Sequence, residues 1–261
     1  MLQNTLTARS YRYACLFSGH PQMDREKKVR FYDNLTAQGV EIGNFEQKAN
    51  EIILTNSPAP PNIRRVVVGN FQDKFRLFVL EDFPNETIEV FKKIADAAWK
   101  VFSDVWTPPA QGFSLAEVSL RYTAAAEGGD ATKFLQKSCI KIPQASLDCL
   151  GRPLQGIGLN LVSPLLVAPN APEGELPLAN ADFKVSIETL LNDPSRLYIQ
   201  VTSKWISTPL PTARGPRDDM KGFPTFLNPE CQKPSWYLEQ AENFVKKQVV
   251  GFLCKAKTDG R

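Results

Sequence analysis

Histidine is nearly absent from this chain, which holds a single one, His20, among 261 residues. A zinc site of the usual kind needs several histidines or clustered cysteines, and the five cysteines are widely scattered with no C-x-x-C spacing. A Ser-His-Asp triad would have to use His20, which lies between Gly19 and Pro21 in a predicted turn. No G-x-S-x-G motif surrounds any serine. The sequence therefore predicts no metal site and identifies no catalytic residue.

Nucleotide-binding loops are missing as well. The glycines of CLGRPLQGIGLN (149–160) do not have the spacing of the dinucleotide fingerprint, and the chain has no Walker loop. The stretch from Gly128 to Thr132 places backbone N–H groups at a predicted helix start, where an anion could bind. An ordinary glycine turn with Asp130 as the helix cap is the favoured interpretation. We therefore expect no cofactor.

No apolar run approaches the roughly 20 residues that a membrane span needs, and no continuous apolar segment marks a secretory signal near the N-terminus. The first 23 residues lack acidic side chains and carry Arg9 and Arg12, which weakly resembles an organelle presequence, although they also read as a first strand. Scattered cysteines in a chain of this length favour reduced, mostly buried thiols and a cytoplasmic location. The net charge of +3 and pI of about 8.5 permit nucleic-acid contact without themselves indicating it.

The clearest pattern that is present is the strand from Glu117 to Thr123. Val118, Leu120 and Tyr122 alternate with polar residues, which is typical of a strand with one buried face. Arg121 is then expected on the opposite face, where a partner could reach it.

Similar patterns predict the other elements. Capping residues, glycines and prolines bound the helices, with Asp24, Asn85 and Ser235 as expected caps. The predicted strands are 10–18, 52–54, 65–71, 75–81, 117–123, 157–162, 183–188 and 196–205, and the predicted helices are 25–38, 86–105, 131–138 and one that begins after Ser235.

The predicted elements divide into two similar halves, 1–109 and 110–261. Each reads as strand, helix, three strands and a long helix, and the second includes a proline-rich loop, 207–234. Ser10-Tyr11-Arg12-Tyr13 echoes Ser119-Leu120-Arg121-Tyr122, which favours an internal duplication. The fold class is therefore α+β, with two βα(β)₃α halves, antiparallel sheets and long helices packed on one face. Joined edge to edge, the halves would form one continuous curved sheet, an order that resembles the tandem TATA-box-binding-protein-like topology.

Three segments resemble a small, sporadically distributed family of bacterial proteins of similar length that has a central L-R-Y strand and no assigned function. They are AEVSLRYTAAA (116–126), WKVFSDVW (99–106) and IETLLNDPSRLYIQVT (187–202). The chain departs from the family at its first strand, ARSYRYACLF (8–17). The resemblance implies no activity.

We expect a non-catalytic binding or protein-interaction module whose binding surface includes Arg12, Tyr13, Arg121 and Tyr122. A protein is the expected partner. The first alternative is nucleic-acid binding on a curved basic and aromatic sheet face, suggested by residues 9–13 and 74–78. The second is an enzyme that uses carboxylates in a pocket covered by the loop 207–234.

Overall fold

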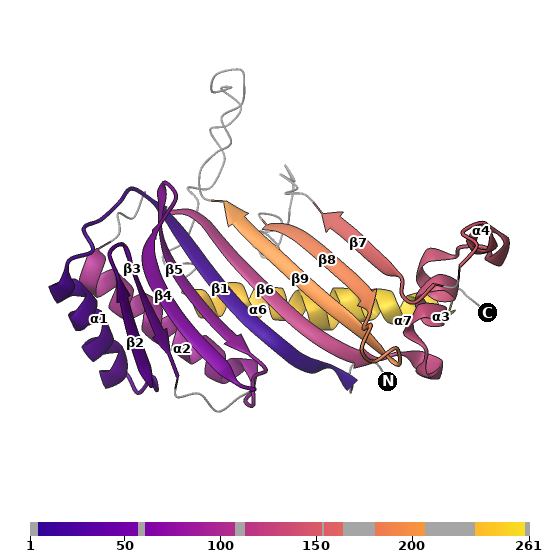
Figure 1. Ribbon diagram of the computed structural model, residues 1–261, viewed down its shortest axis with the longest axis horizontal. Coiled ribbons are helices and arrows are strands. Elements are labelled where there is room, and N and C mark those ends of the chain that lie inside the picture. The colour runs from indigo at the N-terminus through magenta and orange to yellow at the C-terminus, as the bar shows by residue number, and fades with distance from the viewer. Residues whose placement is uncertain are drawn as a thin grey trace, which may run out of the picture.

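The computed structural model describes residues 5–56, 61–107, 113–152, 154–163, 181–206 and 233–258. These residues form one open antiparallel sheet of nine strands, and the long helices lie together on one side of it (Figure 1). The predicted α+β class is confirmed. The proposed boundary at 109/110 and most of the proline-rich loop, 207–232, lie outside the described residues.

In the first half, the described residues form five strands and two helices. They are β1 (Thr7–Ser18), α1 (Arg25–Ala37), β2 (Asn44–Lys48), β3 (Glu51–Thr55), β4 (Ile63–Phe71), β5 (Lys74–Asp82) and α2 (Ile88–Trp106). Asp24 caps α1 as predicted, because its carboxylate accepts a hydrogen bond from the Lys27 N–H at 2.8 Å. Helix α2 begins later than predicted: Thr87, and not Asn85, is its N-cap residue.

Strand β2 is not predicted by the sequence pattern, so the described part of the first half has four strands after its first helix and not the expected three. The residues of β2, NFEQK, lack apolar alternation, and the strand is fixed by contacts with α1 instead. Phe45 stacks on Tyr32 of α1 with ring centroids 4.8 Å apart. The buried Lys28 ammonium donates to the carbonyls of Lys48 and Ala49 at 2.6 and 2.8 Å. Tertiary contacts therefore decide the conformation of this segment.

The described residues of the second half form four strands. They are β6 (Phe113–Ala125), β7 (Gly158–Ser163), β8 (Ala181–Thr189) and β9 (Arg196–Ile206). Short helices α3 (Ala131–Phe134) and α4 (Gln144–Asp148) lie between β6 and β7, and a π-helical turn over 135–140 extends α3. The chain closes with α6 (Pro234–Asn243), a π-helical stretch over 244–249 and α7 (Val250–Thr258).

The closing helix differs from the prediction in two details. Pro234 occupies its first turn with Lys233 as N-cap, and the N–H of Ser235 donates to the Asp96 carboxylate at 2.8 Å. The π-helical stretch adds a residue to one turn, which rotates the remaining side chains about the helix axis. As a result Leu253 is buried, whereas Phe252, which continues the apolar i, i+3 pattern of the sequence from Val249, is partly exposed.

The two halves are joined edge to edge, as expected for one continuous sheet. The strand order is β2-β3-β4-β5-β1-β6-β9-β8-β7, so β1 and β6 form the central antiparallel pair. Outward from this pair, β5, β4, β3 and β2 lie in turn on one side, and β9, β8 and β7 lie in turn on the other (Figure 1).

The core fills the space between the sheet and the helices. Side chains of β1 alternate, and Tyr11, Tyr13, Cys15 and Phe17 all point toward the helices and are buried. Phe102 of α2 stacks on Phe17 and on Phe75 with centroids 5.4 and 5.1 Å apart. Each fully buried large side chain stabilises the fold by about 1.5–3 kcal/mol, so this contact fixes α2 against the sheet.

An ion pair joins the long helices of the two halves. Lys92 of α2 contacts Glu242 of α6 at 3.0 Å and Glu89 at 2.7 Å, and Lys246 also pairs with Glu242. Burial raises the pKa of Glu242, but hydrogen bonds from Lys246 and Lys92 outweigh this and hold the pKa below its ordinary value. Burial likewise lowers the pKa of Lys92, and hydrogen bonds to Glu89 and Glu242 raise it above its ordinary value.

This pairing makes stability depend on pH at both extremes. Glu242 stabilises the fold at pH values above the pKa that its carboxyl has in the unfolded chain, and this stabilisation is lost as the pH falls through the lower pKa of the folded state. The stabilisation by Lys92 is lost as the pH rises through the higher pKa that its ammonium has in the folded state. Glu242→Gln should lower the free energy of unfolding by about 1.5–3 kcal/mol near pH 7. Urea denaturation at several pH values should show that the difference in stability between the wild-type protein and this variant shrinks at acidic pH. Glu239→Gln, at an exposed position of the same helix, is the control and should change little; a pH-independent deficit would contradict the assignment.

Candidate functional site

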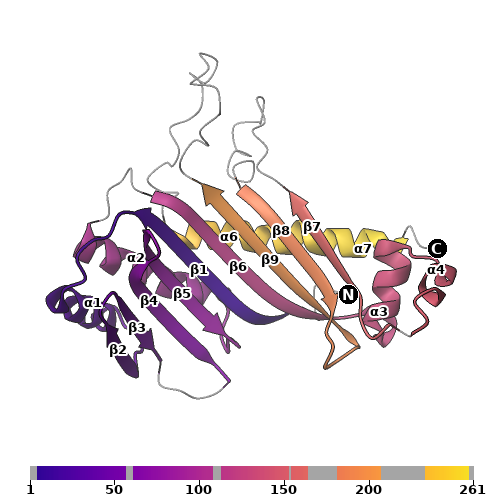
Figure 2. The same ribbon diagram turned by 45° about the horizontal axis from the view of Figure 1, so that its top comes forward.

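The sheet face opposite the helices is the main candidate surface. Throughout the ranges that the structure describes, no helix lies on it, and Figure 2 shows α2, α6 and α7 all behind the strands. Because successive side chains of a strand point to opposite faces, this open face receives the alternate residues that the core does not use. We refer to it below as the open face.

Two arginines lie near the centre of the open face. Arg12 of β1 is directly opposite Ser119 of β6, and Arg121 is two residues further along β6, so the arginines are diagonal neighbours. The Arg12 guanidinium lies over the Phe78 ring, 5.1 Å from its centroid. Burial raises the pKa of Tyr198, and the nearby charge of Arg121 partly opposes this shift. The centre of the face thus combines cations with partly buried aromatic rings.

A groove of about 620 Å³ crosses the open face of the second half. Its charged side chains come from β6, β8 and β9, and we call it the charged groove: Glu117, Asp182, Lys184, Glu188 and Lys204. Lys204 and Glu117 form an ion pair at 3.1 Å across neighbouring strands. Gln200, Thr202 and Ser186 add amide and hydroxyl groups between the charges. The groove therefore offers both signs of charge and both hydrogen-bond donors and acceptors.

The structure separates the four residues that the sequence analysis grouped. Arg12 and Arg121 lie on the open face, whereas Tyr13 and Tyr122 point into the core under the helices. Tyr13 is 0% exposed and stacks on Tyr237, and Tyr122 is 8% exposed and contacts Tyr11 edge-on. Neighbouring residues of a strand point to opposite faces, so an arginine and the tyrosine after it do not share this surface.

The structure gives no support for a catalytic or metal-binding role of the described cysteines or of His20. Four cysteines are described and all are free; burial raises the pKa of the Cys15 thiol, and Cys149 and Cys254 are exposed. The expectation of mostly buried thiols is therefore wrong for these two. His20 is exposed between β1 and α1. In the part of the chain that the structure describes, no group of three His, Cys, Asp or Glu side chains could hold a metal ion.

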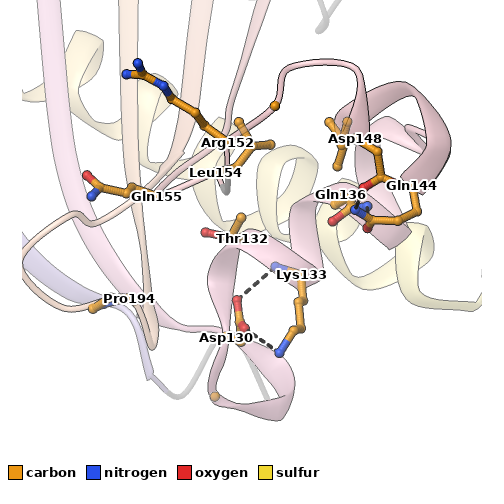
Figure 3. A pocket seen from close by; sticks show the side chains of 13 residues that line it. Asp130, Thr132, Lys133, Gln136, Gln144, Asp148, Arg152, Leu154, Gln155 and Pro194 are labelled. Atoms are coloured by element: carbon orange, nitrogen blue, oxygen red, sulfur yellow. Dashed lines mark hydrogen bonds and ion pairs between the residues drawn. The ribbon is translucent and has the colours of Figure 1, made fainter.

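A second cavity, of about 770 Å³, lies between the α3–α4 segment and the β8–β9 turn. Figure 3 shows Arg152 and Gln155 on one side of it and Gln136, Gln144 and Asp148 on the other. At the glycine turn, the Asp130 carboxylate accepts from the Lys133 N–H at 2.9 Å and pairs with its ammonium at 3.1 Å. A carboxylate thus already caps α3. This favours an ordinary glycine turn at this segment, and not an anion-binding site.

A third cavity, of about 460 Å³, contains a buried carboxylate that the sequence analysis did not distinguish from others. Glu81 accepts hydrogen bonds from Asn62 at 2.9 Å and from Arg64 at 3.2 and 3.4 Å. Asn56 in turn donates to Asn62 and accepts from the Arg64 N–H. Both oxygens of Glu81 are engaged, so this network fixes the start of β4 against β5 rather than presenting a free acid or base.

Comparison with known proteins adds no family: no family model matches the chain, and no curated protein matches it. Among the described helices, none has both the length and the apolar character needed to cross a membrane.

The opposite placement of Arg12 and Tyr13 predicts opposite effects of substitution. Tyr13→Ala should cost about 3–5 kcal/mol in unfolding free energy, as large-to-small changes of buried aromatic residues do. Arg12→Ala, on the open face, should cost less than about 1 kcal/mol. Urea denaturation of both variants measures the difference. Equal costs would show that the two side chains do not lie on opposite faces.

Proposed function

We propose that this protein is a non-catalytic binding module that recognises another protein through its open face. The observation that carries the proposal is the charged groove beside Arg12 and Arg121, on a sheet whose other face is occupied by the core. The rigid sheet holds these side chains in fixed positions, which favours recognition of a defined surface.

The charges of the groove favour a polypeptide over a nucleic acid. Three carboxylates (Glu117, Asp182 and Glu188) accompany two lysines (Lys184 and Lys204). A phosphate backbone would meet these carboxylates unfavourably, since nucleic-acid sites are strongly positive. A protein surface presents both signs of charge together with amide groups, and such complementarity supports specific recognition.

The positions of the perturbed groups favour binding over catalysis. Burial raises the pKa values of Tyr11, Tyr13, Tyr122 and Cys15, which lie in the core, whereas active sites place such groups where substrate reaches them. Burial also raises the pKa of Tyr198 on the open face, but this group is a phenol and not a carboxylate. The buried Glu81 has its oxygens engaged by Asn62 and Arg64. We therefore do not favour the carboxylate enzyme.

We also infer that the two halves derive from an internal duplication. Support comes from the strand order, in which β1 and β6 meet at the centre of the sheet. Outward from them, β5, β4 and β3 on one side correspond in order to β9, β8 and β7 on the other, and β2 is an additional strand of the first half. A cytoplasmic location is proposed from the four free cysteines, since free thiols are typical of reducing compartments.

Affinity capture from the source organism, followed by calorimetry with the purified partner, tests the proposed function. Arg12→Ala with Arg121→Ala should weaken binding about tenfold or more if these cations contact the partner. Exchanging the ion pair (Glu117→Lys with Lys204→Glu) keeps an attractive contact but reverses the local field, and should also weaken binding. Lys247→Glu, at an exposed position of the closing helix, is the control. Unchanged affinity in both open-face variants would refute the proposal.

Nucleic acid remains the alternative that one observation favours: Arg12 and Arg121 lie beside Phe78 and Tyr198 on the same face. Fluorescence anisotropy with mixed DNA and RNA pools should show no binding even at about 50 mM salt, where nucleic-acid binding is strongest. Binding that falls steeply as salt rises, and is abolished by the double arginine variant, would replace the protein partner with a nucleic acid.

A further inference from the structure

The two edges of the sheet are built differently. The β2 edge carries Glu46 and Lys48, charges that usually protect an edge from pairing with another chain. The β7 edge reads Gly-Leu-Asn-Leu-Val-Ser and has neither charge nor proline. Val162 is 69% exposed and Leu161 is 38% exposed. No strand among the described residues lies beyond β7.

We propose that β7 pairs antiparallel with β7 of a second copy of this chain, so that two nine-stranded sheets become one sheet across a two-fold axis. In the first half, β2 covers the edge of β3. In the second half, β7 takes the place that β3 has in the outward order, and no described strand covers its edge. A second copy fills this place on both chains at once, because a two-fold interface uses the same surface twice. The inference does not depend on the proposed function.

The hydrogen-bonding phase of β7 fits this pairing. The N–H of Thr189, at the end of β8, donates to the carbonyl of Ile157, which directly precedes β7. Ile157 and Thr189 are therefore a hydrogen-bonded pair of the β7–β8 ladder. Hydrogen-bonded pairs alternate along an antiparallel ladder. In the register of β7 and β8, the N–H and C=O groups of Gly158, Asn160 and Val162 therefore point to the free edge. A register that places Asn160 opposite its own copy, and Gly158 opposite Val162, pairs all of these groups.

The side chains agree with the same register. The Ser186 hydroxyl donates to Oδ1 of Asn160 at 2.6 Å, which leaves the Asn160 amide group to donate to its copy across the axis. Gly158, which has no side chain, lies opposite the exposed Val162 of the other chain. In the β8 of each chain, Lys184 lies beside Val162 and Glu188 lies beside Gly158. Where Val162 of one copy lies opposite Gly158 of the other, the four residues therefore form a row across the interface, with the lysine of one copy at one end and the glutamate of the other copy at the other end.

An apolar groove under β7 provides the rest of the interface. It has a volume of about 230 Å³ and lies between β7 and the closing helix, with Leu161, Phe244, Val249 and Phe252 among its lining residues. Phe252 is 38% exposed, like Leu161. In the proposed register Leu161 lies opposite Leu159 of the second copy, which extends the apolar layer across the axis and covers the groove.

Sedimentation velocity of the full chain, from about 1 to about 300 µM, tests this inference. The wild-type protein should reach twice the 29.2 kDa mass of the chain. Asn160→Lys and Asn160→Asp each place like charges opposite one another on the axis and should raise the dissociation constant about tenfold or more. An equimolar mixture of the two variants should restore the dimer, because lysine then faces aspartate.

Asn44→Lys makes the same substitution on the opposite edge and should leave the dimer unchanged. Circular dichroism and thermal unfolding verify that the exposed Asn160 variants remain folded, and the restored mixture is itself evidence of folding. A wild-type chain that stays at 29.2 kDa at every concentration overturns the proposal, as does a dimer that both Asn160 variants leave intact. Neither result bears on the capture and calorimetry tests of the open face.

Discussion

The antiparallel pairing of β1 with β6 is the constraint on which the rest of the structure depends. It joins the two halves, and its register places Tyr13 beside Val118 and Arg12 beside Ser119. Because a strand has a period of two, this choice sends one set of side chains into the core under the helices and the other set to the open face. A slip of one residue would bury the arginines and expose the tyrosines, at a cost no surface contact could offset. The core and the candidate binding surface are therefore fixed by the same register.

Much of the fold could be predicted from local pattern because the local signals agree with the global structure. The strand around Leu120, the strands of the β4–β5 and β8–β9 hairpins and the long helix α2 have strong periodicity, and Asp24 caps α1 as its position suggests. Strand β2 could not be predicted, since Lys28 and Tyr32 fix it from another element. The exposure of Phe252 also escaped prediction, because a π-helical stretch changes the helical phase without a clear sequence signal.

The candidate site was predictable only in part. Alternation alone places Arg121 on the open face, and the same rule separates Tyr122 from it. The charged groove, in contrast, combines Asp182 and Lys204 of the β8–β9 hairpin with Glu117 of β6, which is more than 50 residues earlier in the sequence. Its existence depends on strand order and register, which local patterns do not specify. Glu81 illustrates the same point: only its contacts with Asn62 and Arg64 distinguish it from the exposed carboxylates.

The open face and the β7 edge have a geometric connection. A two-fold axis between antiparallel copies of β7 is perpendicular to the sheet, so both open faces would point in the same direction. The charged groove lies on β6, β9, β8 and β7, next to that axis. The two grooves would then be neighbours, and a partner with two equivalent segments could occupy both. Bivalent binding of this kind raises the effective affinity without any new contact within each groove. Individually modest contacts of exposed charges would then suffice for stable recognition, which is consistent with a surface built from mixed charges rather than from a deep apolar pocket.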